Sequence, residues 1–175
     1  MKAVAEAQTK IDFTIVIPVY NEEDAILETV ETVKKTMDKS GCKAYELIIV
    51  DDGSTDQTPT KLEGIDAKIL THHSNCGYGA SLKTGIRAAT GDTIIIADAD
   101  GTYPLAEIPR FISSVSDYDM VVGARAKGKN HTPWYRRFFK FLLGRLGSYV
   151  VGAPIPDLNS GFRAVKKDIL MKYFR

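Results

Sequence analysis

Short, continuous runs of apolar residues alternate with amphipathic stretches along most of the chain. The apolar runs are rich in β-branched residues and are bounded by proline, glycine or aspartate, which predicts strands at residues 13–18, 45–50, 67–71, 93–97 and 119–123. Between them, apolar positions recur at helical spacing, which predicts helices at residues 23–39, 79–89 and 105–115. Pro109 weakens the start of the last helix, and Ser54 or Thr55 is a candidate cap for a further short one.

The alternation of strands and helices predicts an α/β domain with a mostly parallel sheet. The strands are continuous apolar runs, which is typical of parallel sheets that are buried on both faces. We therefore expect a three-layer α/β/α sandwich. In such sheets ligands bind beyond the carboxyl ends of the strands. Conspicuous polar groups follow the first, second and fourth strands, and we expect them at one edge of the sheet: PVYNE, DDGS and DAD.

Asp98 and Asp100 follow the apolar run of the fourth predicted strand. If the strand continued through them, both side chains would leave on the same face, where two like charges repel unless a cation lies between them. Mg²⁺ or Mn²⁺, which prefer hard oxygen ligands, suit such a pair, with substrate phosphates completing the coordination shell. The alternative is a solvated turn in which the two carboxylates cap the following helix.

Two further motifs at the predicted ligand edge have both a binding and a structural interpretation. Asp51 and Asp52 could accept hydrogen bonds from a base N–H or a ribose hydroxyl, or they could form an Asp-Gly turn capped by Ser54. The glycines of the segment at residues 75–79 (NCGYG) allow close backbone approach at a helix N-terminus, which favours anions. The alternative for this segment is an ordinary loop.

Composition adds few constraints beyond a single globular domain. The chain has 175 residues, 44% of them hydrophobic and 26% charged, and its net charge of +1 gives no reason to expect nucleic-acid binding. Cys42 and Cys76 are too far apart for a metal knuckle, so two free thiols are expected. No signal-peptide core and no apolar run of about 18 residues is present. We expect a flexible extension over residues 1–12 and one domain over residues 13–175, truncated at its C-terminal end because the sequence stops within a helical pattern.

A basic, aromatic-rich segment follows the fifth predicted strand. Between Met120 and Pro156 the chain has no Asp or Glu but carries seven basic residues: Arg125, Lys127, Lys129, Arg136, Arg137, Lys140 and Arg145. Within it, Arg136, Arg137 and Lys140 share one predicted helix face beside several aromatic residues. Such a helix suits a membrane interface or a phosphate group. The alternative is a helix packed on the core with a solvated basic face.

Six segments, in this order, resemble the motifs of the family 2 glycosyltransferases, which have the Rossmann-like GT-A fold. They are most similar to the polyprenyl-phosphate sugar transferases of the dolichol-phosphate mannose synthase type. The segments cover most of the chain: IVIPVYNEE (15–23), VDDGSTDQT (50–58), NCGYGAS (75–81), DADGTYP (98–104), GAR (123–125) and DLNSGFRA (157–164).

The resemblance implies a role for each matching position. The nucleotide-sugar pocket would be formed by Pro18, Tyr20, Glu22, Asp51, Asp52 and Asp98. The metal and diphosphate motif would be Asp98 and Asp100, which together with Arg125 would form the catalytic set. The acceptor phosphate would be engaged by Arg136, Arg137, Ser160 and Arg163. Thr102 departs from the pattern, because the mannose synthases usually carry a glutamine there that helps to hold the metal.

The expected activity is a metal-dependent, inverting transfer of a hexose from a UDP- or GDP-sugar to a dolichyl or undecaprenyl phosphate, at the cytoplasmic face of a membrane. A polyprenyl phosphate is already an anion, so it needs positive groups rather than the general base that a hydroxyl acceptor requires. The acid-free basic segment fits this need. The alternatives are a family 2 transferase that acts on a saccharide hydroxyl, and a non-catalytic module that binds a nucleotide sugar or docks on a membrane.

Overall fold

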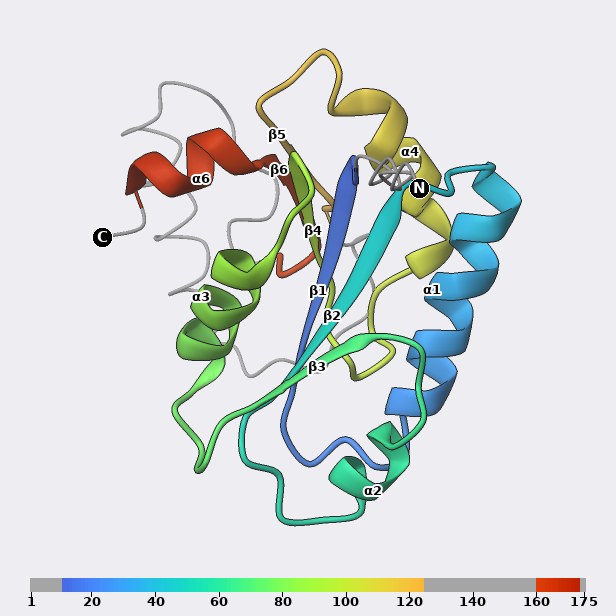
Figure 1. Ribbon diagram of the computed structural model, residues 1–175. Coiled ribbons are helices and arrows are strands. Elements are labelled where there is room, and N and C mark those ends of the chain that lie inside the picture. The colour runs from blue at the N-terminus through green and yellow to red at the C-terminus, as the bar shows by residue number, and fades with distance from the viewer. Residues whose placement is uncertain (1–10, 125–159, 174–175) are drawn as a thin grey trace, which may run out of the picture.

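A twisted six-stranded sheet forms the centre of the part of the chain that the computed structural model describes, residues 11–124 and 160–173 (Figure 1). The strand order is β3-β2-β1-β4-β6-β5. The strands are β1 (Phe13–Val19), β2 (Tyr45–Asp51), β3 (Lys68–Thr71), β4 (Thr93–Ile96), β5 (Met120–Val122) and β6 (Arg163–Lys166).

The first four strands are parallel, and β6 then pairs antiparallel with both β4 and β5. This arrangement confirms the predicted α/β domain with a mostly parallel sheet, and every predicted strand is present with its ends shifted by a residue or so. β6 was not predicted. In the β1–β2 register Val19 lies opposite Asp51, so these two strands end level with each other.

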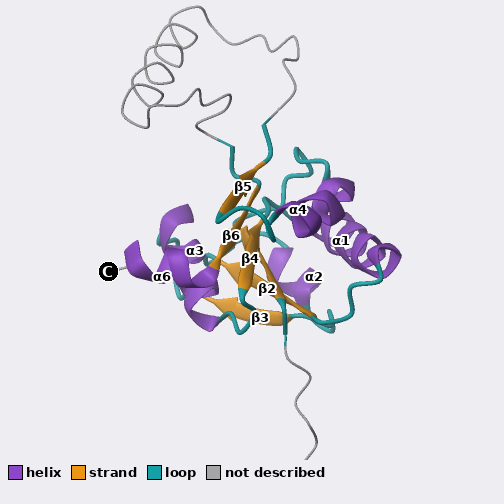
Figure 2. Ribbon diagram, turned by 90° about the horizontal axis from the view of Figure 1, so that it is seen from above, coloured by secondary structure: helices purple, strands orange, loops and turns teal. Residues whose placement is uncertain are grey.

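Helices cover both faces of the sheet, as the continuous apolar strands predicted (Figure 2). The helices α1 (Ile26–Ser40), α2 (Thr58–Leu62) and α4 (Ile108–Ser114) lie on one face. The helices α3 (Tyr78–Ala88) and α6 (Lys167–Tyr173) lie on the other. The result is the three-layer α/β/α sandwich.

Strand β1 contributes to the hydrophobic core on both sides of the sheet. Ile15, Ile17 and Val19 pack in the core beneath α1 and α4, whereas Val16 packs in the core beneath α3. A Cβ on Gly85 of α3 would lie 2.5 Å from a methyl of Val16, so the absence of a side chain at position 85 lets α3 pack closely on the sheet. This close packing fixes the N-terminus of α3 relative to the strand ends.

Two predicted helix starts and one predicted helix cap differ from the structure. The segment from Leu105 begins as a 3-10 turn, and α4 starts only at Ile108, so Pro109 lies in the first turn, where no helical N–H partner is required. Helix α1 starts at Ile26 rather than at residue 23. The predicted cap of the short helix was wrong, because α2 follows Gln57 and has no side-chain cap.

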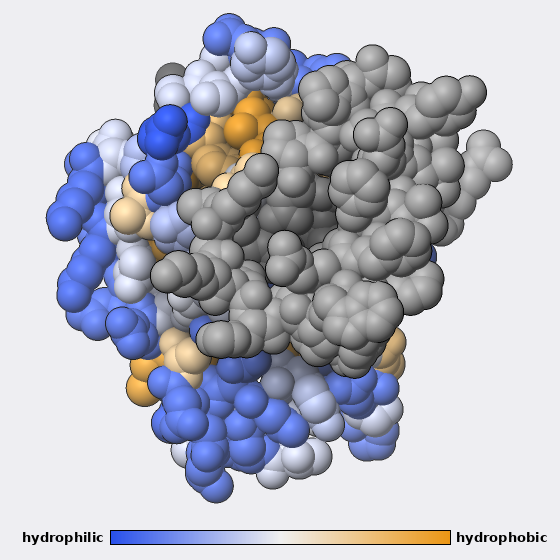
Figure 3. All heavy atoms as spheres, turned by 180° about the vertical axis from the view of Figure 1, so that it is seen from behind, coloured by the Kyte–Doolittle hydropathy of each residue, from blue (hydrophilic) through white to orange (hydrophobic). Residues whose placement is uncertain are grey.

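Two observations bear on the surface. In the described part of the chain, no helix is both long and apolar enough to cross a membrane. The described surface visible from behind is mostly hydrophilic, with small apolar patches between (Figure 3). The predicted N-terminal extension, apart from residues 11 and 12, and the basic segment beyond Ala124 lie outside the described residues.

Candidate active site at the carboxyl edge of the sheet

The carboxyl ends of β1, β2 and β4 meet around a cavity of about 410 Å³. Five of the six residues predicted for the nucleotide-sugar pocket line it, and Asp100 joins them: Pro18, Tyr20, Glu22, Asp52, Asp98 and Asp100. The topology produces this convergence, because parallel strands that end level carry their following loops to the same edge.

Asp51, the sixth predicted pocket residue, has a different position. It is the last residue of β2 and is only 1% exposed. Its Oδ1 accepts a hydrogen bond from the backbone N–H of Ser54 at 3.0 Å, which closes the turn after the strand. Asp51 is not among the residues that line the cavity. Among the described residues, its carboxylate is instead bonded to the turn after β2.

Asp52 is buried and holds the loop before α3. Its Oδ1 accepts hydrogen bonds from the backbone N–H of Cys76 (3.0 Å) and from His72 Nδ1 (2.6 Å), and its Oδ2 accepts one from the N–H of Gly77 (2.7 Å). Burial alone would raise the pKa of this carboxyl, but the hydrogen bonds from Cys76, His72 and Gly77 together hold it below its ordinary value of 3.8. The carboxylate therefore carries its charge at neutral pH.

Reciprocal hydrogen bonds join the loop after β1 to the loop after β2. The backbone N–H of Asn21 donates to Ser54 Oγ at 2.9 Å, and the N–H of Thr55 donates back to Asn21 Oδ1 at 2.8 Å. Similar bonds run from the N–H of Glu22 and Glu23 to the side chains of Thr58 and Asp56, and from the N–H of Gln57 to Glu23. These bonds fix the PVYNEE and DDGSTDQT loops against each other, and Asn21 adopts a φ of 54° within them.

Three carboxylates, Glu22, Asp98 and Asp100, face the same cavity. Burial, and then the negative charges of Asp100, Asp56 and Asp98, raise the pKa of Glu22 above its ordinary value of 4.5. Gathered acids that repel one another are the donor set that a hard divalent cation requires, and the substrate's phosphates could complete its shell. The residues present therefore fit Mg²⁺ or Mn²⁺.

Asp98 and Asp100 lie beyond the end of β4, which stops at Ile96. The strand therefore does not continue through the two aspartates, which was the assumption behind their predicted common face. Both side chains nevertheless reach the same cavity. The capping alternative was also wrong, because neither the 3-10 turn at Leu105 nor α4 has a side-chain cap. Instead, Asp100 Oδ1 accepts hydrogen bonds from the N–H and the hydroxyl of Thr102, at 3.0 and 2.7 Å. Thr102 thus orients Asp100.

Asp98 lies at the junction of three cavities, of about 410, 240 and 1060 Å³. The hydroxyl of Tyr78 donates to Asp98 Oδ1 at 2.8 Å, and burial together with the charge of Asp98 raises the pKa of that phenol well above 10.0. The second cavity is also lined by Ser160, Gly161 and Arg163. Two of the predicted acceptor residues, Ser160 and Arg163, therefore line a cavity that shares Asp98 and Tyr78 with the first one.

Ser160 and its neighbours are built into the fold. Ser160 is fully buried, and its hydroxyl donates to the carbonyl of Gly123 at 2.5 Å. Its own carbonyl accepts a hydrogen bond from Arg163 Nε at 2.7 Å, while the N–H of Gly161 donates to the hydroxyl of Tyr103 at 2.7 Å. These contacts hold the start of β6 against the DAD loop.

Sequence reasoning missed four residues of this edge: His72, Tyr78, Tyr103 and Gly161. Tyr78 and Gly161 lie inside motifs that were recognised, NCGYGAS and DLNSGFRA, so the motifs were a signal for them. Tyr103 also lies in a recognised motif, DADGTYP, but its contact with Gly161, like that of His72 with Asp52, joins residues distant in the sequence and no local pattern reveals it. The predicted Arg125, Arg136 and Arg137 lie outside the described residues.

Comparisons with known proteins agree with this architecture. The family model described as glycosyl transferase family 2 matches residues 14–174. A dolichyl-phosphate hexose transferase of Haloferax volcanii is 30% identical over 161 residues, which cover 91% of this chain and 68% of the relative. An undecaprenyl-phosphate 4-deoxy-4-formamido-L-arabinose transferase of Proteus mirabilis is 32% identical over 164 residues, which cover 90% of this chain and 49% of the relative.

Solved structures show the same fold at lower identity. Glucosyl-3-phosphoglycerate synthase from Mycobacterium tuberculosis, solved with Mn²⁺, UDP and glucosyl-3-phosphoglycerate, matches with a TM-score of 0.70 at 22% identity, over 91% of this chain and 58% of the other. S. aureus TarS, solved with UDP-GlcNAc, matches with a TM-score of 0.65 at 19% identity, over 93% and 47%. The chain spans about half the length of these proteins and of the Proteus relative. With its GT-A fold and a family match over nearly its whole length, the chain belongs to glycosyl transferase family 2.

Proposed function

We propose that this chain is the catalytic domain of an inverting, divalent-cation-dependent hexosyltransferase. Its donor is a UDP- or GDP-sugar and its acceptor is a polyprenyl phosphate, at the cytoplasmic face of a membrane. The observation that carries the proposal is that Asp98 lines two cavities. One is the acid-lined pocket with Glu22 and Asp52, and the other is the pocket with Arg163. The names of the Haloferax and Proteus relatives support the choice of acceptor.

The donor lies in the first pocket. Pro18, Tyr20 and Asp52 contact the nucleoside, and the donor's diphosphate lies beside Glu22, Asp98 and Asp100. Asp52 is suited to this role because its carboxylate is charged and held in place by three hydrogen bonds. Asp51 contributes indirectly, since its bond to Ser54 shapes the loop that precedes α2.

Asp98 and Asp100 would hold the Mg²⁺ or Mn²⁺ ion, and Thr102 keeps Asp100 in position through two hydrogen bonds. When bound, the ion neutralises the diphosphate and so stabilises it as the leaving group. Tyr78 donates a hydrogen bond to Asp98, and its phenol is protonated at neutral pH like that of an ordinary tyrosine. The protein contributes to catalysis by holding these groups in place before the substrates bind.

The acceptor phosphate lies in the second pocket, where Arg163 supplies positive charge and Ser160 positions Arg163 through its carbonyl. From the family motifs we assign Arg136 and Arg137 to the same phosphate and Arg125 to the catalytic set with Asp98 and Asp100; all three lie outside the described residues. A phosphate oxygen attacks the anomeric carbon from the side opposite the leaving diphosphate, so the bond to the diphosphate breaks as the new one forms and the configuration inverts. No general base is required, because the acceptor is already an anion.

A turnover assay on the full-length protein tests the proposal. Radiolabelled UDP- and GDP-sugars are supplied with a polyprenyl phosphate, in Mg²⁺ or in EDTA. We expect a lipid-linked sugar that forms only with the cation and that is lost in Asp100→Ala. Asp66→Ala is the matched control, because Asp66 is fully exposed, precedes the N-terminal end of β3 and, in the described part of the chain, pairs with Lys34 at 3.6 Å.

Two outcomes would overturn the proposal. Donor binding without any product in the full-length protein would indicate a non-catalytic module. Transfer to a saccharide hydroxyl, with the lipid phosphate unused, would indicate the other branch of the family.

A further inference from the structure

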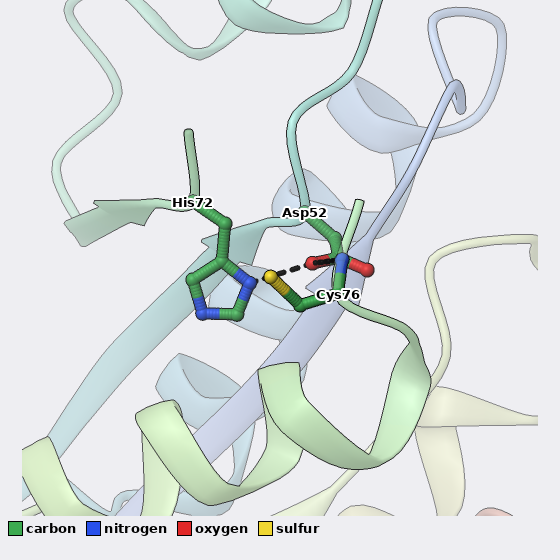
Figure 4. Close-up of side chains that lie close together, drawn as sticks. All are labelled: Asp52, His72 and Cys76. Atoms are coloured by element: carbon green, nitrogen blue, oxygen red, sulfur yellow. Dashed lines mark hydrogen bonds and ion pairs between the residues drawn. The ribbon is translucent and has the colours of Figure 1, made fainter. Parts of the chain in front are cut away.

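Three side chains with different donor atoms meet beside the donor pocket: Asp52, His72 and Cys76 (Figure 4). One oxygen of Asp52, one ring nitrogen of His72 and the sulfur of Cys76 all lie within 4.8 Å of one another. Asp52 follows β2 and His72 follows the neighbouring strand β3, where the N–H of His72 bonds to the carbonyl of Asp51 at 2.8 Å. Cys76 comes from the loop that leads into α3. The sheet topology therefore brings the three together.

The donor atoms select the kind of ion. A thiolate, an imidazole and a carboxylate suit Zn²⁺ and similar thiophilic cations. The set differs from the all-oxygen group of Glu22, Asp98 and Asp100, which suits Mg²⁺ or Mn²⁺. Among the described residues, two candidate cation sites of different chemistry would thus border the same donor pocket.

The surroundings of His72 are those of a metal ligand. Its Nδ1 lies 2.6 Å from Asp52 Oδ1, and its Nε2 lies 2.8 Å from the hydroxyl of Thr84 on α3. If Nδ1 binds a cation, the ring proton moves to Nε2 and donates to the hydroxyl of Thr84. Such an outer hydrogen bond fixes the tautomer and orientation of a metal-binding histidine.

Only small movements would be needed to enclose an ion. Ligands of a tetrahedral zinc lie about 3.3–3.8 Å apart, so His72 and Asp52 would separate by about an ångström as the proton between them leaves. The Cys76 side chain is exposed, and its thiol makes a single weak bond, to the carbonyl of Ser74 at 3.3 Å. It is therefore able to turn toward the other two groups. Gly77 N–H can keep its bond to Asp52 Oδ2 throughout.

We propose that Asp52, His72 and Cys76 form a binding site for a thiophilic divalent cation such as Zn²⁺, and that occupation of this site competes with the nucleotide donor. The second clause rests on the proposed function, because Asp52 also lines the donor pocket with Asn75 and Gly77, the two neighbours of Cys76. Binding releases the thiol proton, so affinity for the cation falls as the pH is lowered.

Cobalt provides a direct test that needs no enzymatic activity. Co²⁺ is titrated into the reduced, metal-free full chain, and the near-ultraviolet thiolate-to-cobalt charge-transfer band is followed. We expect a saturable band at one Co²⁺ per chain that Zn²⁺ displaces. The band should vanish in Cys76→Ser, which keeps the backbone N–H that Asp52 requires. It should persist in Cys42→Ser, because Cys42 lies at the other end of the sheet, packed against the core beneath α1.

The outer hydrogen bond is tested separately with Thr84→Val, which we expect to weaken Co²⁺ binding about 10-fold or more. Absence of the band in the wild-type chain, or its persistence in Cys76→Ser, would overturn the site.

The competition is tested by adding UDP- or GDP-sugar, which should displace Co²⁺ from the wild-type chain. If the band forms but no donor displaces it, the cation site stands and the competition is rejected. Because the titration needs no turnover, its result is independent of whether the transferase assay succeeds.

Discussion

Gly161 lies directly against the carboxylate of Asp98. A Cβ placed on Gly161 would lie 2.6 Å from Asp98 Oδ2 and 3.2 Å from its Cγ, closer than packed atoms allow. The N–H of Gly161 is bonded to Tyr103, which prevents the backbone from moving away, and Tyr78 holds the other oxygen of Asp98. The glycine of the DLNSGFRA segment is therefore part of what positions an acid more than sixty residues earlier in the chain.

Gly161→Ala is expected to displace the Asp98 carboxylate and to lower kcat/KM for sugar transfer by about 100-fold, because a shift of about 1 Å in a reacting group can have that effect. The free energy of unfolding should change little, since the carboxylate is the group that moves. Gly79→Ala is the matched control. Gly79 lies in α3 beside the site, with nothing within 4 Å of its Cβ, so the variant should keep its activity. Equal activity losses in the two variants would contradict this account.

Thr102→Val removes the hydroxyl that donates to Asp100 at 2.7 Å but keeps the shape of the side chain. A hydrogen bond to a charged group contributes roughly 1.5–3 kcal/mol, and Thr102 is exposed, so we expect about a tenfold rise in the Mn²⁺ concentration that gives half-maximal activity. Thr102→Ser keeps the hydroxyl and should behave as the wild type does. An unchanged Mn²⁺ requirement in the valine variant would show that Asp100 needs no such support.

Asp52→Ala leaves the N–H groups of Cys76 and Gly77 and the ring of His72 without their acceptor. We expect the free energy of unfolding at pH 7 to fall by about 2–4 kcal/mol in urea denaturation. Because the folded pKa of Asp52 is lowered, its contribution is present above its ordinary value of 3.8 and is lost as the pH falls through the lower folded value. The difference from wild type should therefore shrink at acid pH. A difference that stays constant below pH 4 would rule out this origin.

Glu22→Gln tests the repulsion among the acids. The folded pKa of Glu22 is raised, so its contribution to stability is fully present below the ordinary value of 4.5 and is lost as the pH rises through the folded value. At pH 7 in EDTA the glutamine variant should therefore melt slightly higher than wild type, by about 1 °C, since Glu22 is only partly buried and solvent weakens the effect of its charge. Adding Mn²⁺ should raise the Tm of wild type more than that of the variant. A scanning fluorimetry series with and without Mn²⁺ measures both effects.

The parts of the fold that the sequence could predict are those set by local patterns. The apolar runs of β1 and β4 identify them as buried strands, and the rule for parallel sheets then brings Asp52 and Asp98 to one edge. Strand β6 escaped prediction because RAVK has only two apolar residues, and its identity as a strand depends on pairing between β4 and β5. The positions of Gly161 and His72 likewise depend on packing between distant segments.

A local pattern can also bring two residues together in a prediction for the wrong reason. Asp98 and Asp100 were expected to share a face of a continuing strand, but β4 ends at Ile96 and the two acids reach one cavity through an irregular loop. The sequence showed that Thr102 stands where the mannose synthases usually carry a glutamine that helps to hold the metal. Its observed contact with Asp100 could not be inferred from the sequence, because it depends on the path of that loop.

The reciprocal bonds between the loops after β1 and β2 bear on how this domain can be recombined with its relatives. Asn21 bonds to Ser54 and Thr55, so neither loop carries a complete set of partners by itself. A chimaera that receives one of the two loops from a protein with other residues at the positions of Asn21 or Ser54 would lose acceptors and donors on both sides of the junction. The two loops therefore have to be exchanged together, although a helix and a strand separate them in the sequence.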